Sequence, residues 1–258
     1  MTMLQIGKLT DIGQRREQNE DSLYAFDSFI QANDGLDSFG LFIVADGTGG
    51  HAGGEIASAI AVRTVASHML EHVYIPCFKH ARLPDLQLLV GHMTEAILLA
   101  NTMVVGTVEK AGSTLTMALL VNRDLYVAHV GDSRAYIHTK GSLKQLTQDH
   151  SLKAKMIEAG QITAEEARKF QIPNIIYNAV GQEADPEVAL YSRTIEPEDT
   201  LLICSDGLWE MVSDAEMVEI IDAAATLNEA VRKLIETANA HGGTDNITAI
   251  LARVAPNH

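Results

Sequence analysis

The chain has 258 residues, with 19 Lys and Arg against 34 Asp and Glu, so its formal charge is −15 with histidine neutral. Such an acidic surface repels the phosphates of nucleic acids and of anionic membranes, and we expect neither as a partner. The hydrophobic share of 47% is that of a globular protein, and two cysteines, Cys77 and Cys204, are too few for a disulfide framework.

Short apolar runs bounded by Gly, Asp or Asn predict eight strands. They lie at 22–27, 39–45, 113–121, 125–130, 135–138, 188–194, 200–204 and 247–253. Turn residues at 122–124 and 139–142 predict antiparallel hairpins in the middle of the chain.

Two pairs of helices are predicted between these strands. The second pair lies near 214–224 and 227–240. The first pair precedes residue 113, and its apolar faces are marked by Ile56, Ile60, Val65 and Met69, and by Leu86, Leu89, Val90, Met93, Ile97 and Val104. Strands, helix pairs and further strands in this order predict an α+β fold, with sheets packed together and helices outside them. Because no low-complexity linker divides residues 1–258, we expect a single domain. No signal peptide or membrane-spanning run is recognisable, and we predict a cytoplasmic location.

Acidic residues lie where predicted strands end or begin. Asp46 follows LFIVA, Asp132 follows VAHVG, Asp206 follows LLICS, and Asp245 comes just before the last strand. Asp-Gly alone is a common turn, but four such sites on neighbouring strand ends would converge. Converging carboxylates repel one another unless a cation neutralises them, and oxygen ligands suit Mg²⁺ or Mn²⁺.

A charged segment near the N-terminus, DIGQRREQNED, adds Arg16, Asn19, Glu20 and Asp21. Such a run is often only a solvated face. An arginine fork, however, can hold a phosphate at two points. Together with the acidic cluster, it favours a metal-assisted phosphate enzyme.

The order and spacing of eight motifs resemble the metal-dependent type 2C protein serine/threonine phosphatases in their compact bacterial form, from about Leu4 to Val254. The motifs are DIGQRREQNED, VADGTGGH with GGEIAS, GSTLTMALL, VAHVGDSRAYI, LTQDHS, EAGQITAEEARKFQIPN, LLICSDGLWE and GGTDNITAI. The resemblance implies a four-layer α-β-β-α sandwich whose two central antiparallel sheets are flanked by helix pairs. It also implies a binuclear Mg²⁺ or Mn²⁺ site at one end of the sandwich.

The resemblance assigns ligands to that site. Asp46 would bridge two tightly bound ions, the carbonyl of Gly47 would bind one of them, and Asp206 and Asp245 would bind the other. With Asp206, Asp132 resembles the ligand of a third, looser ion in bacterial members.

The resemblance also implies supporting roles around the metals. Glu20 and Asp21 would hold metal-bound waters, Arg16 would grip the substrate phosphate, and Asn246 would support the site beside the last aspartate. His51, in the first acidic loop, matches the family's histidine and is our candidate for the proton donor to the leaving alkoxide.

The implied reaction is hydrolysis of phosphoserine and phosphothreonine on proteins by a metal-activated water. The partners would be phosphorylated proteins, with a serine/threonine kinase as the opposing enzyme, and we expect a monomer. A flap at about 150–176 would overhang the cleft. The chain departs from the family at Thr48, where Met is usual, and at Tyr177 and Asn178, where Thr-Arg is common. The alternative is a catalytically weak phosphoprotein-binding or regulatory domain of the same fold.

Other enzyme classes fit the sequence less well. Gly47, Gly49 and Ala52 match a dinucleotide-binding pattern, but no second strand ends in an acid about 20 residues later. Neither cysteine begins a Cys-x5-Arg motif, and Ser133 lies in no G-x-S-x-G elbow. A phosphate-binding G-x-x-x-x-G-K-[ST] loop is also lacking.

Overall fold

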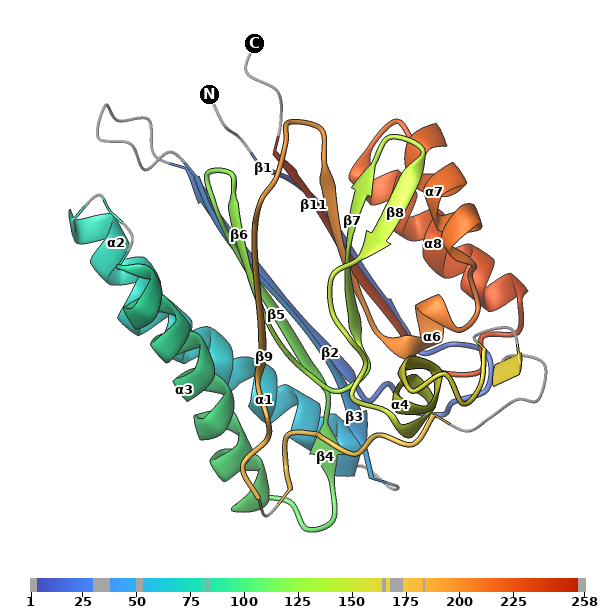
Figure 1. The fold of residues 1–258 in the computed structure, drawn as a ribbon, viewed down its shortest axis with the longest axis horizontal. Coiled ribbons are helices and arrows are strands. Elements are labelled where there is room, and N and C mark those ends of the chain that lie inside the picture. The colour runs from blue at the N-terminus through green and yellow to red at the C-terminus, as the bar shows by residue number, and fades with distance from the viewer. Residues whose placement is uncertain are drawn as a thin grey trace.

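The computed structural model describes residues 4–29, 38–49, 53–80, 82, 84–163, 166–167, 174–182 and 184–254. Two antiparallel sheets lie against each other, and helices cover their outer faces (Figure 1). This is the predicted α+β class and the four-layer α-β-β-α sandwich.

One sheet, here called the β10 sheet, has the order β1-β11-β10-β7-β8. Its strands are β1 (Leu4–Asp11), β11 (Ile247–Val254), β10 (Thr200–Cys204), β7 (Arg134–Thr139) and β8 (Ser142–Gln145). The other, the β3 sheet, has the order β2-β3-β5-β6-β9, with β4 paired to the end of β3. Its strands are β2 (Asp21–Phe29), β3 (Ser38–Thr48), β4 (Gly112–Ser113), β5 (Leu115–Val121), β6 (Asp124–Val130) and β9 (Ala189–Thr194).

The helices form one outer layer on each sheet, as Figure 1 shows. The β3 sheet is covered by α1 (Gly53–Met69), which continues through a π-helical turn (Leu70–Tyr74) into α2 (Ile75–His80), and by α3 (Leu86–Val105). The β10 sheet is covered by α7 (Asp214–Ala223) and α8 (Leu227–Ala240). Two short helices, α4 (Leu152–Glu158) and α6 (Asp206–Trp209), lie at one end of the sandwich.

Strand β3 belongs to two parts of the core. Its run FGLFIVA is apolar without alternation, which is typical of a strand buried on both faces. Leu41 and Ile43 pack with the residues of α1 and α3, whereas Phe42 and Val44 lie between the two sheets. Fully burying each such side chain contributes roughly 1.5 to 3 kcal/mol to folding. The strand that leads to Asp46 is therefore firmly held.

The eight predicted strands and both hairpins are present, but two edge strands were not predicted. β1 pairs with β11 along its whole length, from Leu4 opposite Val254 to Asp11 opposite Ile247. Its sequence LQIGKLTD lacks a clear alternation because Gly7 interrupts it. A Cβ at Gly7 would lie 2.3 Å from the carbonyl oxygen of Leu227, where α8 begins. Tertiary packing, not local propensity, thus makes β1 a strand. The second unpredicted strand, β8, has only four residues and pairs with β7.

Two predicted core positions are wrong, because Ile56 is 45% and Leu86 is 56% exposed. The buried face of α1 is made largely of small residues such as Ala57 and Ala61, which let the helix lie close to the sheet. Hydrophobic periodicity gives these small residues too little weight.

Among the described helices, α3 alone is long and apolar enough to cross a membrane, although we recognised no membrane-spanning run in the sequence. In the fold it is an outer-layer helix, and its buried face carries Leu89, Met93 and Ile97.

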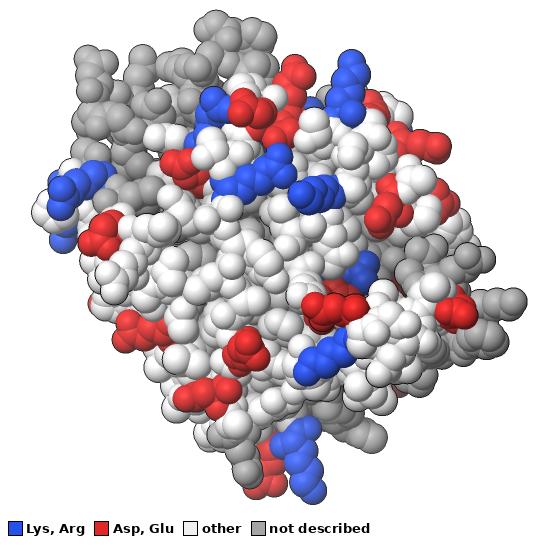
Figure 2. All heavy atoms as spheres, viewed as in Figure 1, with Lys and Arg blue, Asp and Glu red and all other residues white. Residues whose placement is uncertain are grey.

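On the face of the molecule in Figure 2, Lys and Arg side chains are scattered among Asp and Glu.

Candidate metal centre and active site

Four carboxylates from distant parts of the sequence meet at one end of the sandwich. Asp21 opens β2 and lies directly opposite Asp46 in the β2–β3 ladder. Asp206 begins α6 immediately after β10, and Asp245 precedes β11. The other three acids, and also Asp132, which follows β6, are close enough to act electrostatically on Asp46. The structure therefore brings together the acids expected from the sequence.

Asp21 and Asp132 are buried, Asp46 and Asp206 are partly buried, and several of their oxygens lack hydrogen-bond partners among the described residues. Burial, followed by the charge of Asp21, raises the pKa of Asp46 well above its usual value. Burial and the charge of Asp132 do the same to Asp206, whose side chain also shares a hydrogen bond with Asp46. One buried oxygen on each of Asp21, Asp132 and Asp206 has no hydrogen-bond partner among the described residues. Since an unpaired buried polar atom costs about 1 to 3 kcal/mol, the cluster is suited to bind a cation.

Asp21 is oriented by a relay from the neighbouring sheet. The hydroxyl of Ser205 donates to Asp21 Oδ2 over 2.7 Å, and the backbone N–H of Thr248 donates to that hydroxyl over 2.9 Å. Burial raises the pKa of Asp21 to about 6 despite these hydrogen bonds. The second oxygen, Oδ1, has no described partner and is available to a ligand or water.

Asp46 is held at its backbone by polar residues that we had not assigned to the site. Its N–H donates to Thr114 Oγ1 over 2.9 Å, and its carbonyl accepts from the N–H of Thr114 over 2.8 Å. The hydroxyl of Ser113 also donates to this carbonyl, and Thr114 Oγ1 lies 2.7 Å from Ser133 Oγ. The GSTLT motif contained the signal, since two hydroxyl residues at the start of a buried strand need polar partners.

Gly47 lies where no side chain would fit. A Cβ there would be 2.1 Å from the carbonyl oxygen of Gly54 and 2.7 Å from that of Glu20. The N–H of Gly47 donates to the Glu20 carbonyl over 3.1 Å, and a Cβ at Gly54 would lie 2.8 Å from Glu20 Oε1. The start of α1 and the Glu20 side chain are thus packed against the proposed metal-binding loop.

Asn246 connects this site to the N-terminal segment. Its side-chain N–H₂ donates to the carbonyls of Ile12 and Gln18, each over 2.9 Å, and its Oδ1 accepts from the N–H of Glu20 over 2.8 Å. Asn246 is 3% exposed, so water does not replace these bonds easily. Its supporting role is therefore to fix the backbone of the loop that carries Arg16 and Glu20.

Arg16 lies over the acidic cluster and is 48% exposed. Its Nη2 donates to Asp245 Oδ2 over 2.6 Å. The hydrogen bond to Asp245 raises the pKa of the guanidinium, which is charged at any physiological pH. Arg16 therefore contacts a proposed metal ligand at the exposed rim of the acidic cluster.

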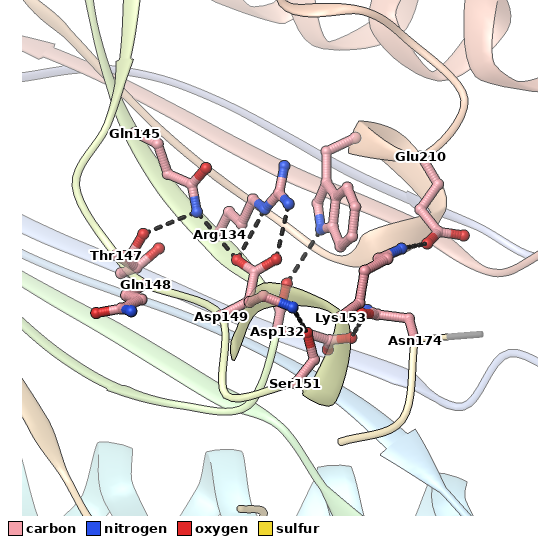
Figure 3. A network of polar contacts seen from close by, with 12 residues as sticks. Asp132, Arg134, Gln145, Thr147, Gln148, Asp149, Ser151, Lys153, Asn174 and Glu210 are labelled. Atoms are coloured by element: carbon pink, nitrogen blue, oxygen red, sulfur yellow. Dashed lines mark hydrogen bonds and ion pairs between the residues drawn. The ribbon is translucent and has the colours of Figure 1, made fainter. Parts of the chain in front are cut away.

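Asp132 acts electrostatically on Asp46 and Asp206 of the cluster, and it contacts Asn174 at the end of the flap (Figure 3). Asn174 donates to its Oδ2, and the indole N–H of Trp209 donates to its carbonyl over 3.1 Å. Burial and the charge of Asp149 raise the pKa of Asp132 to about 7. Its Oδ1 has no described hydrogen-bond partner.

A rigid polar network supports this corner. Arg134 donates twice to Asp149, over 2.9 and 2.7 Å (Figure 3). Its guanidinium carbon lies 3.5 Å from the ring centre of Trp209. Lys153 of α4 pairs with Glu210 over 3.1 Å. These contacts hold α4, at the start of the flap, against α6.

Several expected features lie partly or wholly outside the described residues. His51 is one of them, and the flap at about 150–176 is described only in part. At its far end, Asn178 exchanges two hydrogen bonds with the backbone of Glu187, and its Nδ2 lies 2.8 Å from Nδ1 of the buried His150. The departure at Asn178 thus has a structural role at the base of the flap.

Comparison with known proteins identifies the family to which this chain belongs. The family model of protein phosphatase 2C matches residues 14–252. The chain belongs to the protein phosphatase 2C family. It is a metal-dependent protein serine/threonine phosphatase.

Relatives of this phosphatase agree in sequence and fold. The serine/threonine phosphatase stp of Listeria monocytogenes is 36% identical over 242 residues, which are 94% of this chain and 92% of that protein. The serine/threonine phosphatase of S. agalactiae has a TM-score of 0.84 at 34% identity, covering 98% of this chain and 100% of that one. The catalytic domain of PstP, solved in complex with two manganese ions, has a TM-score of 0.79 at 31% identity, covering 99% and 100%. The predicted family, fold and enzyme class are confirmed.

Proposed function

We propose that this phosphatase binds two Mn²⁺ or Mg²⁺ ions through Asp46, the carbonyl of Gly47, Asp206 and Asp245. The supporting observation is the cluster itself, in which buried and partly buried carboxylates interact electrostatically and some of their oxygens lack a described partner. All donors are oxygens, the set that these hard divalent ions prefer. When bound, the two ions supply an activated water at neutral pH and positive charge for the phosphate oxygens.

The protein's own residues place the reactants around these ions. Asp21, whose Oδ2 accepts from Ser205, and Glu20, whose backbone carbonyl accepts from the N–H of Gly47, would orient waters in the site with their carboxylates. Both acids open or precede β2, whose position is set by its pairing with β3. Catalysis of phosphoryl transfer depends chiefly on such positioning and on electrostatic stabilisation.

Arg16 would bind the substrate phosphate. One nitrogen of its guanidinium, Nη2, donates to Asp245 Oδ2, and its side chain is half exposed. A phosphate offers the same guanidinium two oxygens and more negative charge than one carboxylate. We therefore infer that Arg16 exchanges the carboxylate for phosphate when a phosphoprotein docks. His51 remains our proposed proton donor to the departing serine or threonine oxygen.

Asp132 would provide, with Asp206, a third and looser cation site. The two side chains interact electrostatically, and each has a buried oxygen without a described partner. Asn174, at the end of the flap, occupies the other oxygen of Asp132. Binding at this site would therefore be linked to the position of the flap.

The remaining assignments concern the cell. We propose that residues 1–258 act as one catalytic domain with a flap at about 150–176, that the enzyme is a cytoplasmic monomer, and that it opposes a serine/threonine kinase. The acidic charge of −15 supports the expectation that nucleic acid is not a substrate.

The decisive experiment measures phosphate release from matched phosphothreonine and phosphotyrosine peptides with Mn²⁺, with Mg²⁺ and with EDTA. We expect Mn²⁺ or Mg²⁺ to be required and phosphothreonine to be preferred. Asp206→Asn should lower the rate by orders of magnitude while circular dichroism stays unchanged. Full activity in EDTA, or in the Asp206→Asn variant, would overturn the proposed metal centre.

A further inference from the structure

A second group of metal-ligating side chains lies in the outer helical layer. His68 comes from the last turn of α1, and His92 and Glu95 come from α3, which packs beside α1 (Figure 1). One donor atom from each of the three lies within 4.8 Å of the others. In α1, His68 follows Gly54 by 14 residues, or about 21 Å of helix, and a Cβ at Gly54 would lie 2.8 Å from Glu20 Oε1 of the acidic site. The group is therefore separate from the phosphatase site.

The two histidines present free nitrogen atoms to each other. His68 is only 8% exposed, and neither its Nε2 nor Nδ1 of His92 has a hydrogen-bond partner among the described residues. Both atoms are buried, so water reaches neither of them freely. Two unsatisfied imidazole nitrogens at one point would be costly unless something binds there.

The carboxylate of Glu95 completes the group. Its Oε2 lies 3.7 Å from His68 Nε2 and 3.8 Å from His92 Nδ1, too far for hydrogen bonds. Ligand atoms of a tetrahedral zinc ion with bonds of about 2.1 Å lie about 3.4 Å apart. The two edges that Glu95 shares with the histidines would thus need to close by only a few tenths of an ångström around such an ion, and the third edge, between the two histidine nitrogens, lies within 4.8 Å.

A third histidine borders the site. The ring of His72 lies 4.5 Å from that of His68 and is stacked on that of His92 at 5.7 Å, with 10° between the planes. It lies within the π-helical turn at Leu70–Tyr74, an irregularity that often marks functional positions. Burial and His72 lower the pKa of His68, which keeps its imidazole neutral and its lone pair available.

We propose that His68, His92 and Glu95 form a binding site for a zinc-like divalent ion, which links α1 to α3 on the outer face of the β3 sheet. Two imidazoles and one carboxylate are a ligand set typical of Zn²⁺, Co²⁺ or Ni²⁺ and differ from the all-oxygen phosphatase site. Since the ligands come from two helices, bound metal would stabilise their packing and raise the melting temperature.

The test is a titration of tag-free, full-length protein with Co²⁺ in millimolar Mg²⁺, which occupies the oxygen-ligand site. Four-coordinate Co²⁺ with nitrogen ligands absorbs visible light much more strongly than six-coordinate Co²⁺ with oxygen ligands. We expect one equivalent of strongly absorbing Co²⁺, displaced by Zn²⁺, and with Zn²⁺ a rise of about 5 °C or more in melting temperature.

Two variants and a control assign the ligands. His92→Gln and Glu95→Gln alter partly exposed side chains, so both should fold and keep full Mg²⁺-dependent phosphatase activity, yet bind Co²⁺ at least about 10-fold more weakly. His241→Gln is the matched control, because His241 also faces a glutamate, Glu216 at 3.7 Å, but lies outside the three-residue group. Absence of the strong absorption in the wild type, or Co²⁺ affinity equal to that of the wild type in both variants, would overturn the proposal.

Discussion

Replacing Asn246 by Ala tests whether one buried amide holds the N-terminal segment in the active site. The substitution removes the hydrogen bonds to the carbonyls of Ile12 and Gln18 and from the N–H of Glu20. It leaves in place the backbone bond from the N–H of residue 246 to Asp245 Oδ1. The perturbation therefore acts on the segment that carries Arg16 and not on the proposed metal ligand itself.

The expected cost follows from these three hydrogen bonds. Each contributes a net 0.5 to 1.5 kcal/mol, so their joint loss lowers the free energy of unfolding by about 3 kcal/mol. In a protein of this size, that loss corresponds to a melting temperature lower by about 6 to 12 °C. Asn246→Asp keeps the acceptor for Glu20 but points a carboxylate oxygen at the two carbonyls, within an already acidic cluster. It should destabilise the protein at least as much.

Urea unfolding followed by circular dichroism, in EDTA, measures this effect without a contribution from metal binding. Asn228→Ala is the matched control, since Asn228 is exposed on α8 and should change stability by less than about 0.5 kcal/mol. With Mn²⁺ present, Asn246→Ala should also raise KM for phosphopeptide, because Arg16 loses its fixed position. If Asn246→Ala unfolds at the same urea concentration as the control, the amide does not hold the segment and our reasoning is wrong.

Further predictions concern the carboxylates and the phosphate-binding groups. In EDTA, the free energy of unfolding should fall as pH rises from about 4 to 7, because burial raises the folded-state pKa of Asp21 to about 6 and of Asp132 to about 7. Stability from the protonated forms is then lost as they ionise, and a urea midpoint that rises over this range would contradict the assignment. Asp46→Asn should raise the stability of the metal-free protein at pH 8 and abolish Mn²⁺-dependent turnover; a metal-free variant no more stable than wild type would argue against repulsion in the cluster. Arg16→Ala should raise KM for phosphopeptide by about one to two powers of ten. An unchanged KM would mean that Arg16 only pairs with the carboxylate of Asp245 and does not bind phosphate. Asp132→Ala should retain two tightly bound ions in a metal titration but lose much of its turnover, whereas wild-type stoichiometry with wild-type rate would make Asp132 a turn residue. His51→Gln should lose about 10² to 10⁴ in rate on phosphothreonine peptide and much less on an activated aryl phosphate; equal losses would place the proton donor elsewhere.

The sequence alone predicted most of the scaffold that carries the acidic site. Apolar runs such as FGLFIVA, followed by Asp46, determine a buried strand and an acidic turn through local physics, so these elements could be located without a structure. The order of eight motifs then identified the family. The exceptions were elements that tertiary contacts stabilise, such as β1. Its Gly7 is required because the start of α8 packs against it and leaves no room for a side chain.

Only the tertiary structure decided which polar side chains support the site. Ser205 bonds to Asp21 across 184 positions, and Asn246 bonds to Glu20 across 226, so no local pattern could pair them. The cluster of His68 with His92 and Glu95 likewise exists only because α1 and α3 pack side by side. Periodicity determines which face a residue occupies on its own element. The contact between two elements depends on their relative position, which only the packing of the whole core determines.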